Sequence, residues 1–257
     1  GNNSVGVTGA AFGASIAGHR LIACGFSDST AADALSYHNG EIDIYSNSWG
    51  PFDSGNILDG PGPITIAAIE DSIYNGRSGL GNIYTWAAGN GLDADDNSNY
   101  DGYSNMRYSI GVAAITHYGE QSWYSEPGAN ILVTAHSNGG TPDYEGITTT
   151  DITGNGGYDG GDVTHDFGGT SSATPLVSGV IALVLEANPD LTWRDVQNIL
   201  VHSSRKNDAS DSSWNLNGAG HDVSHKFGFG AVDAGAAVSL ALNWSSSGEE
   251  SNASFGP

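Results

Sequence analysis

The chain has 257 residues, 38% of which are hydrophobic, and it contains 38 glycines. This composition predicts an ordered domain with many tight turns and argues against a disordered tail. The formal net charge is −22, and the seven Lys and Arg residues form no basic stripe, which argues against nucleic-acid binding. No apolar run reaches the ~18 residues of a membrane span, and the single cysteine, Cys24, excludes an intrachain disulfide.

Short apolar runs alternate along the chain with patterns of helical spacing. The runs are bounded by Gly, Asn or Pro and are typical of buried parallel strands. They lie at residues 17–23, 42–46, 82–87, 110–115 and 131–134. We therefore expect a mostly parallel sheet in which each strand is followed by a crossover.

The helical patterns fall between and after these runs, at residues 30–37, 64–75, 175–187 and 233–243. A further helix is predicted to begin after Thr192, whose side chain is suited to cap it. Together these elements predict one α/β domain with helices on the faces of the sheet. Residues 154–162 are rich in Gly and Asp and are predicted to form a loop, and 245–257 are predicted to be a linker towards a further C-terminal domain.

The segment FGGTSSATP, residues 167–175, is the strongest signal for chemistry in the chain. Its glycines allow a sharp turn, and a serine follows at the start of the predicted helix. The N–H groups and partial positive charge of a helix N-terminus favour a serine whose attack creates an oxyanion. Taken alone, the segment favours the simpler interpretation that Thr170 or Ser171 is only a helix cap, since Ser and Thr are common there.

The same segment matches the nucleophile motif of the subtilisin-like serine proteases, in which the serine directly after Gly-Thr attacks; that serine is Ser171 here. The run WAAGNG resembles the strand end at which an asparagine of this family donates to the oxyanion hole, and Asn90 holds that position. The closer resemblance is to the kexin- and furin-like proprotein convertases, from about Asn2 to Trp244. Its matching segments include IYSNSWGP (44–51), GRSGLG (76–81), DGYSN (101–105), WYSE (123–126) and SHKFGFGAVDA (224–234).

The resemblance implies a subtilisin-like three-layer α/β fold with a central parallel sheet, in which residues 1–244 form a partial catalytic domain without its N-terminal part. It implies a secreted serine endopeptidase that acts on polypeptides with basic residues, with a pro-segment as a candidate inhibitor. The lack of paired cysteines differs from the animal convertases and favours a bacterial extracellular enzyme. Its signal peptide is expected to lie outside this chain.

Substrate contacts follow from the resemblance position by position. Ser48, Trp49 and Gly50 match the strand edge that pairs with an extended peptide. Asp53 and Asp101 match the acidic base of the pocket for the residue before the scissile bond, where two carboxylates would select Arg or Lys. The outer subsite for a basic residue is matched by Asp59 and Tyr103.

Calcium (Ca2+) is the cofactor that the resemblance implies. The resemblance implies that Asp53, Asp96 and Glu126 form one calcium site, and three carboxylates from separate loops would repel one another unless a hard cation joined them. Asp93 and Asp95 are neighbouring acids that could replace Asp96. A second calcium site is matched in part by Asn3 with the backbone carbonyls of Val5 and Val7, and its other ligands are expected upstream.

The chain departs from the family pattern in its catalytic base. The family triad is Asp, His and Ser in chain order, and its histidine lies in a His-Gly-Thr motif. None of the eight histidines is followed by Gly-Thr, so we expect the triad His and Asp to lie upstream of this chain and the chain alone to be inactive. Phe52 replaces an acid of the convertases, which favours selection of one basic residue over strict dibasic processing. The alternative is a non-catalytic, calcium-dependent peptide-binding module, a pseudoenzyme.

Overall fold

Four parallel strands form the central sheet of the computed structural model, which describes residues 6–23, 25–139 and 145–246. Their order is β1 (Ile44–Asn47), β2 (Ile83–Ala87), β3 (Ser109–Ile115) and β4 (Ile131–His136). The two central strands, β2 and β3, are buried along their whole length, as strands between two layers of helices are. Four of the predicted strands are thus confirmed, with small shifts of their ends.

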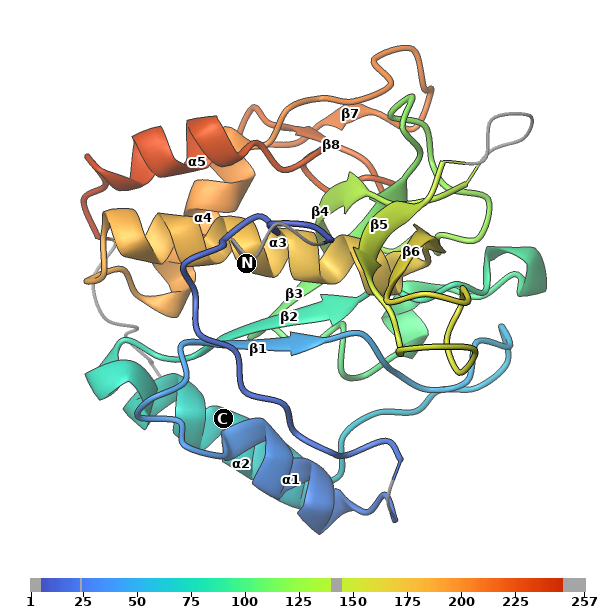
Figure 1. Ribbon diagram of the computed structural model, residues 1–257. Helices are drawn as coiled ribbons and strands as arrows, with labels where there is room; N and C mark the ends of the chain where they lie inside the picture. Colours follow the sequence, from blue (N-terminus) through green and yellow to red (C-terminus); the bar gives the residue numbers. More distant parts are fainter. Residues whose placement is uncertain (1–5, 24, 140–144, 247–257) are drawn as a thin grey trace.

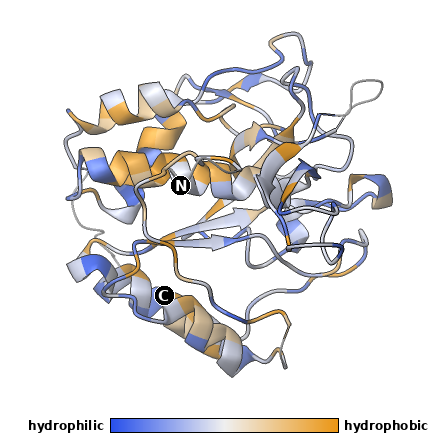
Figure 2. Ribbon diagram, viewed as in Figure 1, coloured by the Kyte–Doolittle hydropathy of each residue, from blue (hydrophilic) through white to orange (hydrophobic). Residues whose placement is uncertain are grey.

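Three helices lie on one side of the sheet: α3 (Thr170–Ala187), α4 (Trp193–Ser203) and α5 (Ala234–Ala241) (Figure 1). Of these, α3 and α4 pack on the strands, and α5 packs on α3 and α4. The central helix, α3, contacts all four strands, and apolar residues are concentrated on α3 and α5 (Figure 2). Among the described residues, α3 is the one helix long and apolar enough to cross a membrane by length and composition. Its apolar face is instead packed in the largest core cluster, with Val177, Ile181 and Val184 fully buried.

Two helices, α1 (Asp28–Ser36) and α2 (Pro63–Asn75), cover the opposite face of the sheet (Figure 1). Ile69 and Ile73 of α2 pack there against aromatic residues of the sheet, including Tyr84 and Trp86. The expected three-layer α/β architecture is therefore confirmed. The predicted cap of α4 is confirmed as well, because the Thr192 side chain accepts a hydrogen bond from the backbone N–H of Asp195.

The predicted strand at residues 17–23 is wrong. This segment belongs to none of the sheets of the described residues, and it runs over the surface towards α1 (Figure 1). Within it only Leu21 is buried, while Ile22 is 64% exposed. An apolar run forms a strand only where a neighbouring strand satisfies its backbone groups and a second layer covers its side chains.

Several short elements have no counterpart in the sequence prediction. They are η1 (Gly76–Gly79), η2 (Leu92–Ala94), η3 (Ser98–Tyr100) and the strands β5 (Ile147–Thr150), β6 (Val163–Phe167), β7 (Asn215–Leu216) and β8 (Asp222–Val223). The strands β5 and β6 form an antiparallel pair whose connection contains the predicted loop at 154–162. The predicted linker lies almost entirely outside the described residues.

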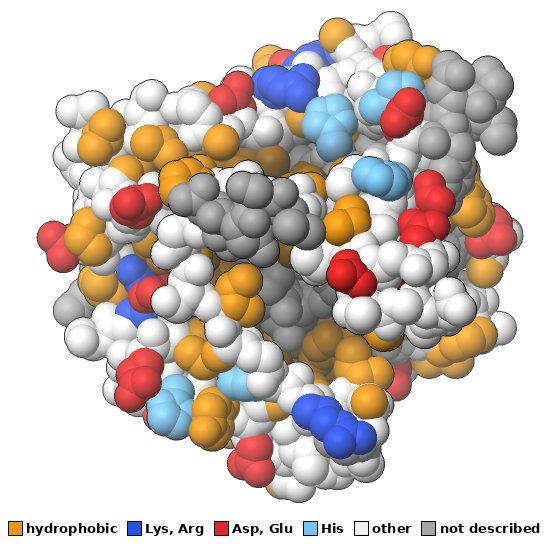
Figure 3. Space-filling model, viewed as in Figure 1, with side chains coloured by type: hydrophobic (Ala, Val, Ile, Leu, Met, Phe, Trp, Pro, Cys, Tyr) orange, Lys and Arg blue, Asp and Glu red, His pale blue; other side chains and the backbone are white. Residues whose placement is uncertain are grey.

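The carboxyl ends of β1 and β2 lie at the same end of the domain as the first turn of α3 (Figure 1). Ligands of open parallel sheets bind at the carboxyl ends of the strands. Acidic side chains are spread over the face shown in Figure 3 and do not gather in one surface patch. The fold, and not the overall negative charge, therefore indicates where to look for a site.

Candidate active site

Ser171 is the second residue of α3 and follows a sharp turn of the backbone. Gly169 caps the helix with φ 79° and ψ 170°, a conformation that is essentially restricted to glycine. The Ser171 side chain is half-buried at the wall of a pocket, and its hydroxyl has no hydrogen-bond partner within the described residues. The predicted placement of this serine at a helix N-terminus is confirmed.

Asn90 follows the end of β2 and lies beside the first turn of α3. Its Oδ1 accepts hydrogen bonds from the backbone N–H of Thr170 at 2.8 Å and from Thr170 Oγ1 at 3.0 Å. Because Oδ1 is fixed in this way, the orientation of the amide group is fixed too. The Nδ2 donor has no partner among the described residues, and Asn90 lines the same pocket as Ser171. A directed donor next to a serine hydroxyl can stabilise an oxyanion.

Ser48, Trp49 and Gly50 continue directly from the carboxyl end of β1, the edge strand of the described sheet. Ser48 Oγ donates a hydrogen bond to the carbonyl oxygen of Ser171 at 2.9 Å. The Trp49 carbonyl accepts one from Trp86 Nε1 at 2.6 Å. These bonds hold the segment against the serine and the sheet, and all three residues line the pocket.

Asp101 lies at the wall of the pocket near Gly50. Its Oδ1 accepts a hydrogen bond from the backbone N–H of Tyr103 at 2.7 Å. A Cβ atom on Gly50 would lie 3.0 Å from Asp101 Oδ2, so the glycine leaves room for the carboxylate. Burial raises the pKa of Asp101 to about 6, and repulsion from Asp53 and Asp59 adds to the effect. A cationic side chain in the pocket would reverse this shift.

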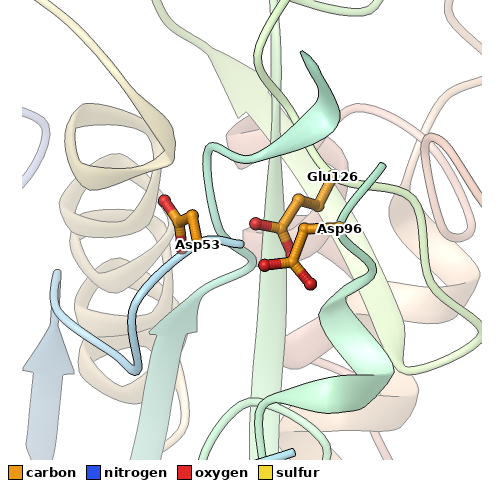
Figure 4. Close-up of side chains that lie close together, drawn as sticks. All are labelled: Asp53, Asp96 and Glu126. Atoms are coloured by element: carbon orange, nitrogen blue, oxygen red, sulfur yellow. The ribbon is translucent and has the colours of Figure 1, made fainter. Parts of the chain in front are cut away.

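Asp53, Asp96 and Glu126 form an acidic cluster that lines part of the same pocket (Figure 4). Each offers one carboxylate oxygen, and these oxygens lie within 4.8 Å of one another. Asp53 is exposed, whereas Asp96 and Glu126 are buried. Asp96, and not the exposed Asp93 or Asp95, thus belongs to the cluster.

Backbone N–H groups surround the three carboxylates. Asp53 accepts from Asn90, Asp96 from Ser54 and Asn97, and Glu126 from Gly91. Cβ atoms on Gly89 and Gly91 would come within 2.2 Å of Glu126 and 2.8 Å of Asp53, respectively. The two glycines around Asn90 therefore allow the chain to pass close to the acidic side chains.

Three carboxylates in this arrangement repel one another. Burial raises the pKa of Glu126 to about 8, with repulsion from Asp53 and Asp96 adding to it. Partial burial and repulsion from Asp96 also raise the pKa of Asp53. None of the ion pairs among the described residues includes these acids. An all-oxygen donor set from three loops fits a hard divalent cation such as calcium.

Two residues predicted for the outer subsite lie away from this pocket. Tyr103 is 5% exposed, and its ring stacks on Trp86 and meets Trp49 edge-on. Asp59 is exposed and lines a neighbouring pocket with Leu58 and Ile66. The structure therefore does not bring them together with Ser171.

The second predicted calcium site lies mostly outside the described residues. This is the case for Asn3 and Val5, whereas Val7 is described and is 37% exposed. The pocket beside Ser171 is lined by no histidine among the described residues. Among the described residues, the structure therefore brings together the serine, the amide, the strand edge and the acidic groups, without a histidine.

The subtilase family model matches residues 1–230 of the chain. The chain is 41% identical over 243 residues to the Drosophila melanogaster "Furin-like protease 1, isoform 1-CRR" and 44% identical over 243 residues to the rat "Proprotein convertase subtilisin/kexin type 6". These matches cover 95% of the chain and 21% and 25% of the relatives. The chain thus belongs to the subtilase family and spans about a fifth to a quarter of the relatives' length. Because these relatives come from animals, they do not support the expectation of a bacterial source.

Solved structures show the same fold. A serine protease of Aeromonas sobria superposes with a TM-score of 0.77 at 24% identity, covering 87% of this chain and 47% of that one. A protease from Pseudoalteromonas arctica superposes with a TM-score of 0.69 at 27% identity, covering 93% and 67%. The predicted subtilisin-like fold is therefore confirmed.

The sequence prediction did not identify the polar groups that contact the turn before Ser171. Tyr124, Ser137 and Asn138 contact the backbone of Gly169. Tyr124 lies in the matched segment WYSE, which was the available signal, but the prediction assigned a role only to Glu126. Ser137 and Asn138 follow β4, and no motif in the sequence marks them.

Proposed function

We propose that the protein containing this chain is a calcium-dependent serine endopeptidase that cleaves polypeptides after a basic residue. The observation that carries the proposal is the placement of Ser171 at the start of α3, next to the Asn90 amide and the acidic pocket. Membership of the subtilase family supports the reaction class. Relatives named as proprotein convertases support a polypeptide substrate.

Substrate binding uses the edge of β1 and the acidic pocket. An extended peptide adds a strand along Ser48–Gly50 through backbone hydrogen bonds. The side chain before the scissile bond then enters the pocket beside Ser171, where Asp101 and Asp53 favour Arg or Lys. The hydrogen bond from Ser48 to the Ser171 carbonyl fixes the distance between this edge and the serine.

The chemical step is an attack of Ser171 Oγ on the peptide carbonyl carbon. The carbonyl oxygen becomes an oxyanion, and Asn90 Nδ2 donates a hydrogen bond to it. Removing such a donor in related chemistry costs about 100- to 1000-fold in kcat. The Thr170 contacts hold Asn90 Oδ1, so the amide does not need to reorient during the reaction.

The reaction also needs a general base for the serine proton. We propose that a histidine and an aspartate from outside residues 1–257 supply it, because no histidine lines the pocket among the described residues. Calcium bound to Asp53, Asp96 and Glu126 neutralises their repulsion and orders the loops beside the pocket. Secretion is part of the proposal, since millimolar calcium and polypeptide substrates occur together outside the cell.

The experiment compares the full-length protein with its Ser171→Ala variant on a peptide that contains one arginine. Cleavage after the arginine by the wild type and its loss in the variant are expected. Ser239→Ala, an exposed serine on α5, is the matched control and keeps full activity. Cleavage that survives in Ser171→Ala would contradict the proposal. Calcium-dependent binding of the peptide without cleavage by the wild type would instead identify a peptide-binding module.

A further inference from the structure

The backbone of Gly169 determines where Ser171 lies, and it cannot hold this conformation by itself. Its φ of 79° and ψ of 170° fall in a region that other residues avoid. Glycine populates many other conformations as readily, so a glycine turn is fixed only by its contacts. The groups that hold Gly169 therefore decide how well the hydroxyl of Ser171, two residues later, is positioned.

The N–H group of Gly169 is held by two side chains. It donates to Tyr124 Oη at 3.0 Å and to Asn138 Oδ1 at 3.1 Å. These two acceptors also contact each other, because Tyr124 Oη lies 2.7 Å from Asn138 Oδ1 and can donate to it. One N–H group is thus bound by a pair of side chains that orient one another.

The carbonyl group of Gly169 is held as well. It accepts from Ser137 Oγ at 2.8 Å and from Ser172 Oγ at 3.2 Å. Ser137 Oγ also lies 2.8 Å from Tyr124 Oη. Both polar groups of this residue are therefore tied to one network.

The network is buried and anchored in rigid parts of the fold. Tyr124 is 4% exposed and Asn138 is 6% exposed. The Tyr124 ring belongs to the largest core cluster, and the carbonyl of Asn138 accepts from Ser122 Oγ at 2.7 Å. A Cβ atom on Gly168 would lie 2.0 Å from the Asn138 side chain, so the turn passes directly over it. Buried hydrogen bonds of this kind fix geometry and are costly to break.

We propose that Tyr124 and Asn138 are positioning residues for the nucleophile Ser171. They hold the turn at Gly168–Gly169, so that the first residues of α3 and the hydroxyl of Ser171 keep one orientation towards Asn90 and the substrate carbonyl. The inference rests on the proposed role of Ser171. Small displacements of a reacting group lower the rate strongly while leaving substrate contacts elsewhere unchanged.

Tyr124→Phe in the full-length protein tests this role, because it removes one hydroxyl and keeps the ring in the core. Tyr45→Phe is the matched control, since Tyr45 is equally buried and its hydroxyl donates to the Tyr37 carbonyl at 2.7 Å. We expect kcat of Tyr124→Phe to fall about tenfold or more, with KM within about twofold of the wild type. The control should lose similar thermal stability without a change in kcat. In a double variant, the loss of kcat caused by Asn138→Ala should not add to the loss caused by Tyr124→Phe.

Amide hydrogen exchange at Gly169 provides a readout that does not depend on cleavage. It should become about tenfold faster in Tyr124→Phe and stay unchanged in Tyr45→Phe. Unchanged kcat, or unchanged exchange, in Tyr124→Phe would overturn the inference. If the wild type cleaves no peptide but exchange at Gly169 is faster in Tyr124→Phe, the role of Tyr124 in holding the turn is supported. In that case only the proposed function is overturned.

Discussion

At the scale of single residues, the pocket beside Ser171 contains carboxyl groups whose pKa values differ. Asp101 is half-buried, and burial raises its pKa to about 6, whereas the pKa of Glu126 is raised to about 8. Asp101 is thus ionised at neutral pH in the free pocket and is the group best placed to attract a cationic side chain. Glu126 is mostly protonated there at neutral pH, and a cation beside it would favour its ionised form.

Selectivity for arginine should therefore depend on pH through Asp101. As the pH falls through about 6, Asp101 becomes protonated and loses its charge. The ratio of kcat/KM for an arginine peptide to that for its citrulline counterpart should fall over this range, because the ratio cancels the titration of the general base. In Asp101→Asn the ratio should be low and independent of pH. A ratio that stays constant in the wild type would contradict the role of Asp101.

Residues inside short motifs were predictable, and residues that act through distant contacts were not. The positions of Ser171 at the start of α3 and of Asn90 after β2 were predictable, because adjacent residues determine the turn around each. Tyr103 was expected in a subsite, but its ring is buried between Trp49 and Trp86. Which side of a loop residue faces the substrate depends on packing between segments far apart in the sequence.

At the scale of elements, prediction succeeded where two signals agreed. The strand at 83–87 is apolar except for Thr85 and is followed closely by the turn residues Gly89-Asn90. The helix after Thr192 has both a cap and an inward-facing stripe. The run at 17–23 is interrupted by Gly18, His19 and Arg20, and the described residues give it no partner strand. The short strands β5 to β8 contain few apolar residues, so their pairing leaves little trace in the sequence.

The cap of α4 gives an element-scale prediction. Thr192 Oγ1 accepts from the backbone N–H of Asp195 at 3.2 Å, and the Asp195 carboxylate accepts from the backbone N–H of Thr192 at 3.0 Å. Thr192→Ala should lower the free energy of unfolding by about 1 kcal/mol. Thr192→Ser keeps the hydroxyl and should lose much less. Urea denaturation measures both, and equal stability of the alanine variant and the wild type would contradict the cap.

At the scale of the whole molecule, the acidic cluster joins parts of the chain that are distant in sequence. Asp53 follows β1, Asp96 follows η2, and Glu126 lies between β3 and β4. Backbone N–H groups from Ser54, Asn90 and Gly91 bind the same carboxylates. A cation at this point would therefore order the loops around the pocket together with Asn90.

Calcium should stabilise the protein more at high pH than at low pH. Without a cation, the folded-state pKa of Glu126 is about 8, above its ordinary value of 4.5. Protonated Glu126 contributes stability that is fully present below pH 4.5 and is lost as the pH rises through about 8. Between these two pH values the folded state binds more protons than the unfolded state. Calcium bound to the ionised carboxylates would restore this stability.

The chelator-induced drop in Tm should thus be larger at about pH 9 than at about pH 6. Glu126→Gln resembles the protonated carboxyl group and should show a smaller drop and less dependence on pH. Equal drops in the wild type at both pH values, or none, would contradict a calcium site at this cluster.

Covalent labelling of the intact protein tests the central claim most directly. A peptide phosphonate with arginine at the reactive end forms a bond with an activated serine that is positioned beside a pocket for basic side chains. After digestion, mass spectrometry should find the added mass on Ser171, and the label should be absent from Ser171→Ala. Labelling of a different residue, or equal labelling by the uncharged citrulline analogue, would contradict a serine endopeptidase that selects basic residues at this site.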